Sequence, residues 1–422
     1  MSYKMLTFDN GLKVVCHFLP EAKSVAVGIW FQAGSRFETY RENGISHFLE
    51  HMLFKGTENR SCLQLKQEIE GVGGSFNAFT SEELTCYWIK ILSRYLERSL
   101  DVLSDMILHP LLQEEDMKKE KIVIAEELHL LHDQPAQYVH ELFQKALFSP
   151  HPLGQPVLGS EKTVFRFAKN DLLRYLKKFY TATNSVISIS GNFPAGALKN
   201  LVKRFWGRWT AGKKNQFHPW PGNFSGPGIK IENRDTQQVN FCLGGPAVSV
   251  FSEKKYAFAL LNTILGGNTI SRLFESVREK LGLSYDIRSY VKHYQDTGAF
   301  VISGGVSPDK METTLDVIVR EMRMLRDKGL KPGELSQARE FLTGQILMAL
   351  EESLEDMLWI GEQQTIQGRI LTPEDVIKKI NEVKAEEVSD LARVFFQPAK
   401  LCLVMVGPAA KKERLHRILA KL

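Results

Sequence analysis

Apolar and polar positions along the chain follow two alternating periods, one typical of strands and one typical of helices. Short apolar runs and strict alternation predict strands near residues 3–8, 12–18, 24–32, 83–91 and 185–193. Apolar positions at helical spacing predict helices between them, among them one that carries residues 47–57 and two near 93–108 and 114–131. Mixed periods of this kind imply a protein of mixed α and β structure. The fold class that we expect is α+β, with helices packed on a mostly antiparallel sheet.

Two strand patterns of the first half return in the second half at nearly the same offset. The run SVISISGNF at residues 185–193 is echoed by KLCLVMVGPA at 400–409, and VAVGIWFQAG at 25–34 is echoed by QVNFCLGGPA at 238–247. A single strand that ends in glycine means little, but two pairs at one offset of about half the chain indicate a duplication. We therefore predict two related domains.

The stretch WGRWTAGKKNQFHPWPGNFSGPG separates the two halves and shows no apolar period. Its glycine, proline and polar content is typical of a linker. The predicted boundary lies near residue 215. Residues 1–215 would form the domain that carries the chemistry described below, and residues 216–422 would form its relative without a metal motif.

Composition and charge exclude several classes of protein. Apolar residues make up 43% of the chain and charged residues 24%, which is typical of a globular protein and not of a disordered or fibrous one. The formal net charge of +5 is spread along the chain without a basic run that contains aromatic residues, so no nucleic-acid partner is expected. Since 18 apolar residues never occur in a row, no membrane span is expected either.

The cysteines and the start of the sequence predict a cellular compartment. The five cysteines are Cys16, Cys62, Cys86, Cys242 and Cys402. None of them forms a CxxC pair, and four of the five lie in apolar, strand-like runs. This usage is typical of buried free thiols in a reducing environment. The first 20 residues lack the charged head and apolar run of an export signal, so a cytoplasmic location is expected.

The segment HFLEH places two histidines and a carboxylate on one turn of a predicted helix. His47 and His51 lie about 40° apart on the helix surface, and Glu50 falls beside them. Two imidazoles at this spacing can bind one Zn²⁺, while the carboxylate reaches a water on the metal. The alternative is an ordinary amphipathic helix with two histidines at its polar edge.

A catalytic zinc needs a third protein ligand, and the predicted helix at 114–131 offers one. Glu120 and Glu127 are seven residues apart, which returns them to within about 20° of the same helical face. One carboxylate could bind the metal while the other supports it. Glu126 and His129 point about 100° and 200° away from that face, so they are poorer candidates.

Three segments in order resemble the M16, or inverzincin, family of peptidases, which includes insulysin, pitrilysin and the mitochondrial processing peptidase. They are GISHFLEHMLFKGT, GGSFNAFTSEELTCYW and EKIVIAEEL. The second half adds GGNTISRLFESVREKLGLSYDI at residues 266–287, so the resemblance spans nearly the whole chain. The length is similar to that of short bacterial members related to the processing peptidase. One departure is GGNTIS, where many members have a third glycine.

For the metal site, the resemblance implies a zinc ion, one per chain, held by His47, His51 and Glu127. It implies that Glu50 is the general base. Glu120 matches a second carboxylate of the same helix, which supports the site without necessarily contacting the metal.

For the substrate, the resemblance implies residues in both halves. Asn77, Ala78 and Phe79 match an edge strand that pairs with the peptide backbone, and such pairing would give weak sequence preference. Arg278 and Tyr285 match an arginine and a tyrosine that reach toward the substrate. Without the resemblance, Asn77 would be interpreted as a turn residue after a glycine cluster.

The implied activity is that of a zinc-dependent endopeptidase, which hydrolyses peptides or unfolded segments held in extended form inside a closed chamber. Zinc would lower the pKa of a bound water to about 7, and Glu50 would accept its proton. Tyr285 and Arg278 would donate hydrogen bonds to the oxyanion. Because long family members have about twice this length, we expect a homodimer in which these two residues complete the partner subunit's site.

Two other functions are compatible with parts of the sequence. Some relatives without the metal motif are non-catalytic subunits that bind extended peptides, but a pure binder does not need a base beside two metal ligands. A structural zinc site would usually use four protein ligands, typically including cysteine, and Cys62 and Cys86 are not placed to serve. The enzyme is therefore the preferred hypothesis.

Overall fold

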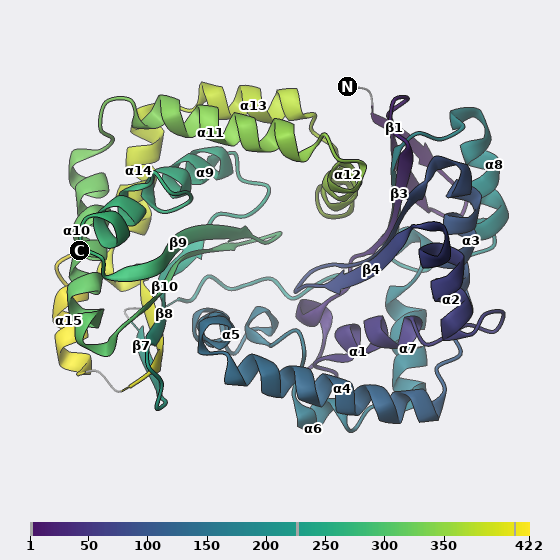
Figure 1. The fold of residues 1–422 in the computed structure, drawn as a ribbon, viewed down its shortest axis with the longest axis horizontal. Coiled ribbons are helices and arrows are strands. Elements are labelled where there is room, and N and C mark those ends of the chain that lie inside the picture. The colour runs from purple at the N-terminus through teal and green to yellow at the C-terminus, as the bar shows by residue number, and fades with distance from the viewer. Residues whose placement is uncertain (1–2, 225–227, 409–410) are drawn as a thin grey trace. The chain divides into compact units, whose positions relative to one another are not determined.

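The fold was taken from a computed structural model that describes residues 3–224, 228–408 and 411–422. The chain forms two compact units, each built from one mixed sheet with helices on both faces (Figure 1). Most strand pairs in both sheets are antiparallel. The predicted α+β class is confirmed.

The two units exchange segments of the chain. The first unit comprises Met1–Leu128, Gln155–His218 and Leu347–Thr372, and the second unit comprises the remainder. One passage between the units lies at His218 and Pro219, close to the predicted boundary near residue 215. The exchange of residues 129–154 and 347–372 is a feature that no single boundary along the sequence can describe.

The sheet of the first unit has the order β1-β2-β6-β3-β5-β4. Its strands are β1 (Tyr3–Thr7), β2 (Lys13–Phe18), β3 (Ser24–Phe31), β4 (Ser75–Thr80), β5 (Thr85–Leu92) and β6 (Ser185–Gly191). Strands β2 and β6 are parallel, and the other neighbours are antiparallel. The central strand β3 is buried on both faces, which explains its continuous apolar run, whereas β4 lies at an edge and alternates in exposure.

The sheet of the second unit repeats this topology. Its order is β7-β11-β8-β10-β9, in which β7 and β11 are parallel. The strands are β7 (Gly228–Asn233), β8 (Val239–Ala247), β9 (Ser284–His293), β10 (Gly298–Val306) and β11 (Cys402–Gly407). The order is that of the first sheet without β1, and the two echoed sequence pairs occupy equivalent places, β6 with β11 and β3 with β8. The predicted duplication is thus confirmed at the level of topology.

Helices cover both faces of the first sheet. The main core lies on the face that receives Val14 and Cys16 of β2, whereas Val15 faces the opposite side, as expected for alternating side chains. The helices that follow the strands of this unit are α1 (Ile45–Leu53), α2 (Cys62–Ile69), α3 (Leu96–Leu108), α4 (Glu114–Asp133), α6 (Glu161–Val164), α7 (Lys169–Phe179) and α8 (Ala195–Trp206). The opposite face is covered by α12 (Ser353–Gln367), whose Met357 and Ile360 pack on it.

Helix α12 approaches its sheet closely because it carries a glycine at the contact. A Cβ on Gly361 would lie 2.1 Å from Nε1 of Trp30 on β3. A network of buried polar groups holds the same helix, since Oδ2 of Asp356 lies 2.8 Å from Nδ1 of His17 and also accepts a hydrogen bond from Ser190. The pairing of α12 with this sheet is therefore specific.

The second unit has the corresponding arrangement. Its main core is formed with α9 (Lys254–Leu265), α10 (Met311–Lys328), α11 (Glu334–Ala349), α13 (Pro373–Glu382), α14 (Ala385–Phe395) and α15 (Lys412–Leu419). The other face of its sheet is covered by α5 (Pro135–Phe148), whose Val139, Leu142 and Phe143 contact Cys242 and Val404 in one apolar cluster. Each sheet is thus covered on one face by a helix from the opposite half of the sequence.

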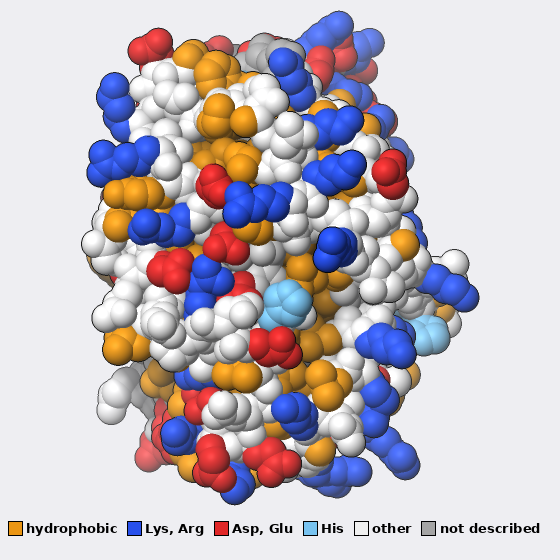
Figure 2. Space-filling view, turned by 90° about the vertical axis from the view of Figure 1, so that its right-hand side faces the viewer, with side chains coloured by type: hydrophobic (Ala, Val, Ile, Leu, Met, Phe, Trp, Pro, Cys, Tyr) orange, Lys and Arg blue, Asp and Glu red, His pale blue; other side chains and the backbone are white. Residues whose placement is uncertain are grey.

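The surface of the molecule carries charges of both signs. On the face drawn in Figure 2, lysine and arginine side chains are interspersed with acidic and apolar ones, without an extended area of one sign. Within the part of the chain that the structure describes, no helix has the length and apolar character needed to cross a bilayer.

Candidate metal centre

Helix α1 presents three polar side chains along one edge. It begins after Gly44, whose left-handed φ of 93° turns the chain into the helix. Phe48, Leu49 and Met52 are fully buried in the main core of the first unit. This burial fixes the rotation of the helix, so that His47, Glu50 and His51 lie on the half-buried edge.

Helix α4 places Glu127 against both histidines. Oε2 of Glu127 lies 3.7 Å from Nε2 of His47 and 3.6 Å from Nε2 of His51. One ligand atom from each of the three residues lies within 4.8 Å of the other two. Among the described residues, this is the one set of three or more metal-ligating side chains that converges in this way.

This donor set fits a zinc ion. Tetrahedral zinc with bonds of about 2.0–2.1 Å places neighbouring donor atoms about 3.4 Å apart. The two imidazole-to-carboxylate distances of 3.7 and 3.6 Å are close to that value. Three protein ligands also leave a coordination position for water or substrate, which distinguishes a catalytic site from a closed structural one.

Glu120 lies behind His51 and connects it to a lysine. Oε2 of Glu120 lies 3.0 Å from Nδ1 of His51, and its Oε1 lies 2.5 Å from Nζ of Lys55. Burial alone would raise the pKa of Glu120, but hydrogen bonds from His51 and Lys55 outweigh burial and lower it. An ionised carboxylate at Nδ1 orients the imidazole so that Nε2 faces Glu127.

The two histidines differ in their electrostatics. Burial, assisted by the charge on His51, lowers the pKa of His47 to about 3, so His47 stays in the neutral form that binds metal. Burial also disfavours the charged form of His51. The hydrogen bond to Glu120 and the nearby carboxylates outweigh this effect and raise the pKa of His51 in the metal-free protein.

Glu50 is tied to the edge strand of the sheet. Oγ1 of Thr80, the last residue of β4, donates a 2.6 Å hydrogen bond to Oε2 of Glu50. Burial raises the pKa of Glu50, and the bond from Thr80 partly opposes this. A carboxylate held beside the two histidines, with a raised pKa, has the properties of a general base.

The three predicted substrate-binding residues lie on β4 at the edge of the first sheet. Asn77 is exposed and accepts a 2.8 Å hydrogen bond from the backbone amide of Ala78. Phe79 is 37% exposed and packs edge-on against Trp30. Strand β4 pairs with β5 on one side alone, so its other side is a free edge of the sheet. An extended peptide can pair with such an edge as an additional strand.

Arg278 and Tyr285 belong to the second unit and lie against each other. The guanidinium carbon of Arg278 lies 4.3 Å from the centre of the Tyr285 ring and 4.6 Å from the centre of the Phe274 ring. Tyr285 is 80% exposed on β9, an edge strand of its sheet. The structure thus brings these two predicted residues together, on an open surface of their own unit.

Two residues that contact the candidate site were not predicted from the sequence: Lys55, which pairs with Glu120, and Thr80, which donates to Glu50. Lys55 follows His51 by four residues, a spacing that places both side chains on one face of a helix. This spacing is the feature of the sequence from which a role for Lys55 could have been predicted. Thr80 shares the two-residue period of Phe76 and Ala78, so it points to the same face of the sheet as they do. Its contact with Glu50 depends on how α1 crosses β4 and has no local signal.

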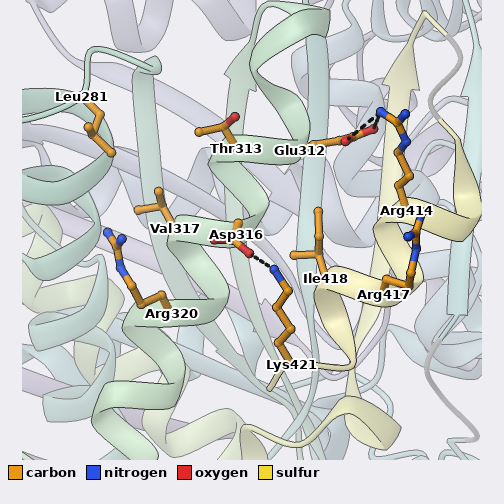
Figure 3. A pocket seen from close by; sticks show the side chains of 10 residues that line it. All are labelled: Leu281, Glu312, Thr313, Asp316, Val317, Arg320, Arg414, Arg417, Ile418 and Lys421. Atoms are coloured by element: carbon orange, nitrogen blue, oxygen red, sulfur yellow. Dashed lines mark hydrogen bonds and ion pairs between the residues drawn. The ribbon is translucent and has the colours of Figure 1, made fainter.

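A separate cavity of about 810 Å³ lies in the second unit between α10 and α15 (Figure 3). Its two acidic side chains are both paired, Glu312 with Arg414 at 3.4 Å and Asp316 with Lys421 at 2.5 Å. Acidic groups held in this way do not converge on a common point. This cavity therefore lacks the donor set found on α1 and α4.

Comparison with known proteins assigns the chain to a family. The model described as "Insulinase (Peptidase family M16)" matches residues 13–161, and the model described as "Peptidase M16 inactive domain" matches residues 166–342. YmxG of Bacillus subtilis (strain 168), described as an uncharacterised zinc protease, is 36% identical over 411 residues, which cover 96% of this chain and 98% of YmxG. This chain belongs to peptidase family M16. The resemblance seen in its motifs is therefore confirmed, including the similarity to short bacterial members.

Solved structures of the M16 fold superpose on nearly the whole chain. A Pseudomonas fluorescens protein described as a peptidase M16 inactive domain has a TM-score of 0.91 at 20% identity and covers 97% of this chain and 98% of its own. A protease from Helicobacter pylori has a TM-score of 0.91 at 21% identity, with 96% and 99% covered. At these identities the likeness concerns the fold, and it agrees with the two related units described above.

Proposed function

We propose that this M16 family member is a zinc-dependent endopeptidase that hydrolyses peptides or unfolded segments held in extended form. The observation that carries the proposal is the convergence of His47, His51 and Glu127 within 4.8 Å, with Glu50 on the same helical edge. The name of the relative YmxG, a zinc protease, supports the choice of metal.

His47, His51 and Glu127 would hold the metal, with Glu120 supporting His51. When bound, zinc supplies a Lewis acid that polarises the scissile carbonyl and makes a water acidic near neutral pH. Glu50 would accept the proton of the attacking water and pass it to the leaving amine. Its bond to Thr80 keeps the carboxylate oriented during this transfer.

The substrate backbone would add a strand to the free edge of β4. Residues 77–79 would then run beside the peptide, with Thr80 at the end nearest Glu50. Because backbone hydrogen bonds supply most of such an interaction, we expect broad sequence preference. A peptide that is already unfolded or short would fit, since a folded segment cannot offer a free strand.

Arg278 and Tyr285 would complete the site from the second domain, residues 216–422, of a partner subunit. Their contact and the exposure of Tyr285 are compatible with donation to a substrate oxyanion. This assignment makes the protein a homodimer with an enclosed chamber, in which each metal domain, residues 1–215, works with the partner's second domain. We further propose that it acts in the cytoplasm.

The direct test is hydrolysis of a quenched-fluorescence peptide library by the purified chain. We expect cleavage that is lost with a zinc chelator and restored by added zinc. Glu50→Gln should reduce kcat by about 10²–10⁴-fold, because it removes the proton acceptor while keeping the shape of the side chain. Glu126→Gln, an exposed position on α4, is the matched control and should keep full activity. Cleavage that survives both the chelator and Glu50→Gln would exclude the mechanism.

A further inference from the structure

The two histidine rings of α1 are held in different ways. The ring of His51 is oriented through its second nitrogen, because Nδ1 faces Glu120 at 3.0 Å. Nδ1 of His47 is buried and has no hydrogen-bond partner among the described residues. The direction of the His47 ring therefore depends on the backbone from which it projects, at the start of the helix.

That backbone is held by a carboxylate from outside the helix. One oxygen of Glu38 accepts hydrogen bonds from the amide of Ser46 at 2.9 Å and from its hydroxyl at 2.6 Å. The other oxygen accepts from the amide of Gly44 at 2.8 Å and from Nδ2 of Asn43 at 3.1 Å. Gly44 occupies the N-cap position and has no side chain, so Glu38 replaces the missing cap.

The surroundings of Glu38 make this a rigid anchor. Glu38 is 3% exposed, and its backbone carbonyl accepts a hydrogen bond from Gln155. The hydroxyl of Ser46 also lies 2.6 Å from that of Tyr175 on α7. A Cβ on Gly44 would approach the carbonyl oxygen of Leu158 to 2.7 Å, so the start of α1 packs tightly against the loop that precedes α6.

We propose that Glu38 is a positioning residue for the metal centre, which sets the direction of His47 by anchoring the first turn of α1. The inference rests on the proposed function, since it assumes that His47 binds the metal. Ser46, which Glu38 holds through two hydrogen bonds, directly precedes His47. A shift of this turn would move the Nε2 atom of His47 away from Glu127, while His51 would still be oriented by Glu120.

A buried carboxylate elsewhere in the first unit provides a matched control. Asp105 on α3 is also 3% exposed and accepts hydrogen bonds from Thr57 at 2.6 Å, Asn59 at 2.7 Å and Arg60 at 2.8 Å. These partners lie outside the set of proposed ligands. Glu38→Gln and Asp105→Asn each replace a buried carboxyl group that accepts several hydrogen bonds with the corresponding amide. Burial raises the pKa of Glu38, whereas at Asp105 the hydrogen bonds from Thr57 and Arg60 outweigh burial and lower the pKa. Asp105→Asn should therefore lower the Tm at least as much as Glu38→Gln does.

The test compares these variants in metal affinity and in stability. Zinc dissociation constants are measured by competition with a chromophoric chelator, and Tm values are measured on the metal-free proteins. Support for an imidazole ligand from outside the coordination sphere typically changes metal affinity by 10- to 100-fold. We expect Glu38→Gln to raise the zinc Kd at least about tenfold and Asp105→Asn to leave it within about twofold, although Asp105→Asn lowers the Tm at least as much.

Spectroscopy and a milder variant keep the test decisive. The cobalt-substituted Glu38→Gln protein should show an altered visible absorption spectrum, whereas Asp105→Asn should match the wild type. If Glu38→Gln does not fold, Ser46→Ala removes one donor of the same anchor and should shift the Kd in the same direction. Equal Kd values and spectra for the Glu38, Ser46 and Asp105 variants would overturn the inference while leaving the proposed function intact. A wild-type protein that neither binds zinc nor cleaves peptides would instead overturn the proposed function.

Discussion

The first and second units share one topology but differ in the helix that follows the equivalent strands β3 and β8. In the first unit this helix is α1, whose apolar residues fill the core while its edge carries His47, Glu50 and His51. In the second unit it is α9, which has the sequence KKYAFALLNTIL and contains neither histidine nor acid. The fold therefore needs only the apolar residues at this place, and the proposed metal ligands are an addition that one copy carries and the other lacks.

The comparison extends to the helix that carries Glu127, the proposed third ligand. Helix α4 in the first unit and α11 in the second both follow the helix after the second-last strand of their sheets. Glu120 and Glu127 of α4 face α1, so two helices of one unit supply the whole donor set. The second unit instead offers Arg278 and Tyr285, which suits a role in contacting substrate and not metal.

The largest expected effect separates two adjacent acids on α4. Glu127→Gln removes a proposed ligand and should raise the zinc Kd by more than about 100-fold, because its loss exceeds that of an outer support. Glu126→Gln changes an exposed neighbour and should leave the Kd unchanged. Isothermal titration with zinc distinguishes the two. Equal affinities would show that α4 does not supply the third ligand.

Heterodimers of two variants test whether the first domain of one subunit works with the second domain of its partner. In the proposed homodimer, Glu50→Gln would disable the first domain and Tyr285→Phe would disable the second, so each variant alone should be weakly active. Co-expressed heterodimers should regain activity well above both parents, since one of the two sites then has an intact Glu50 and an intact Tyr285. The kcat of affinity-purified heterodimers checks this. Activity no higher than the mean of the parents would contradict a site shared between subunits.

A stability test addresses the helix that covers the first sheet from the other half of the sequence. Gly361→Ala forces a Cβ toward Trp30 and should lower the free energy of unfolding by about 1–3 kcal/mol. Gly196→Ala lies in α8, where nothing lies within 4 Å of the added methyl, and should be neutral or slightly stabilising. Denaturant unfolding of both variants measures the difference. An unchanged midpoint for Gly361→Ala would show that α12 packs less closely than described.

The smallest expected effect concerns the proton titration of one half-buried histidine in each unit. Burial lowers the pKa of His47 to about 3 and that of His140 to about 4, and Arg288 and Lys292 contribute to the second. In the unfolded chain both histidines have an ordinary pKa near 6.5. Between pH 6.5 and the lowered pKa of each histidine, the unfolded chain therefore binds more protons than the folded protein does. Each histidine therefore costs the metal-free protein stability as the pH falls through that window.

Histidine-labelled NMR can follow the two rings separately. Zinc should suppress the titration of His47, because metal and proton compete for one imidazole, and should leave His140 unchanged. Replacing His140 by a neutral residue should reduce the loss of stability between pH 6.5 and 4 in both the metal-free and the zinc-loaded protein. A zinc-dependent shift at His140 and none at His47 would place the metal elsewhere.

Local features of the chain were readable from the sequence alone. The predicted strands at 12–18 and 24–32 correspond to Lys13–Phe18 and Ser24–Phe31, because alternation and β-branched runs depend on near neighbours. The spacing of His47 and His51, and that of Glu120 and Glu127, set which side chains share a helical face. The duplication was visible because two strand patterns kept their glycine ends.

Contacts between distant segments were decided by the tertiary structure. Whether α4 lies beside α1 depends on packing of the whole unit, so the meeting of Glu127 with the two histidines could be inferred only from family resemblance. The bonds of Glu50 to Thr80 and of Ser46 to Glu38 join segments whose separation in the chain carries no periodic signal. The exchange of α5 and α12 between the units was also decided by the tertiary structure. The apolar face of an amphipathic helix predicts that the helix packs on an apolar surface, but it does not predict which sheet provides that surface. Gly361 against Trp30 and Asp356 beside His17 select that partner, and such complementarity exists only once the chain has folded.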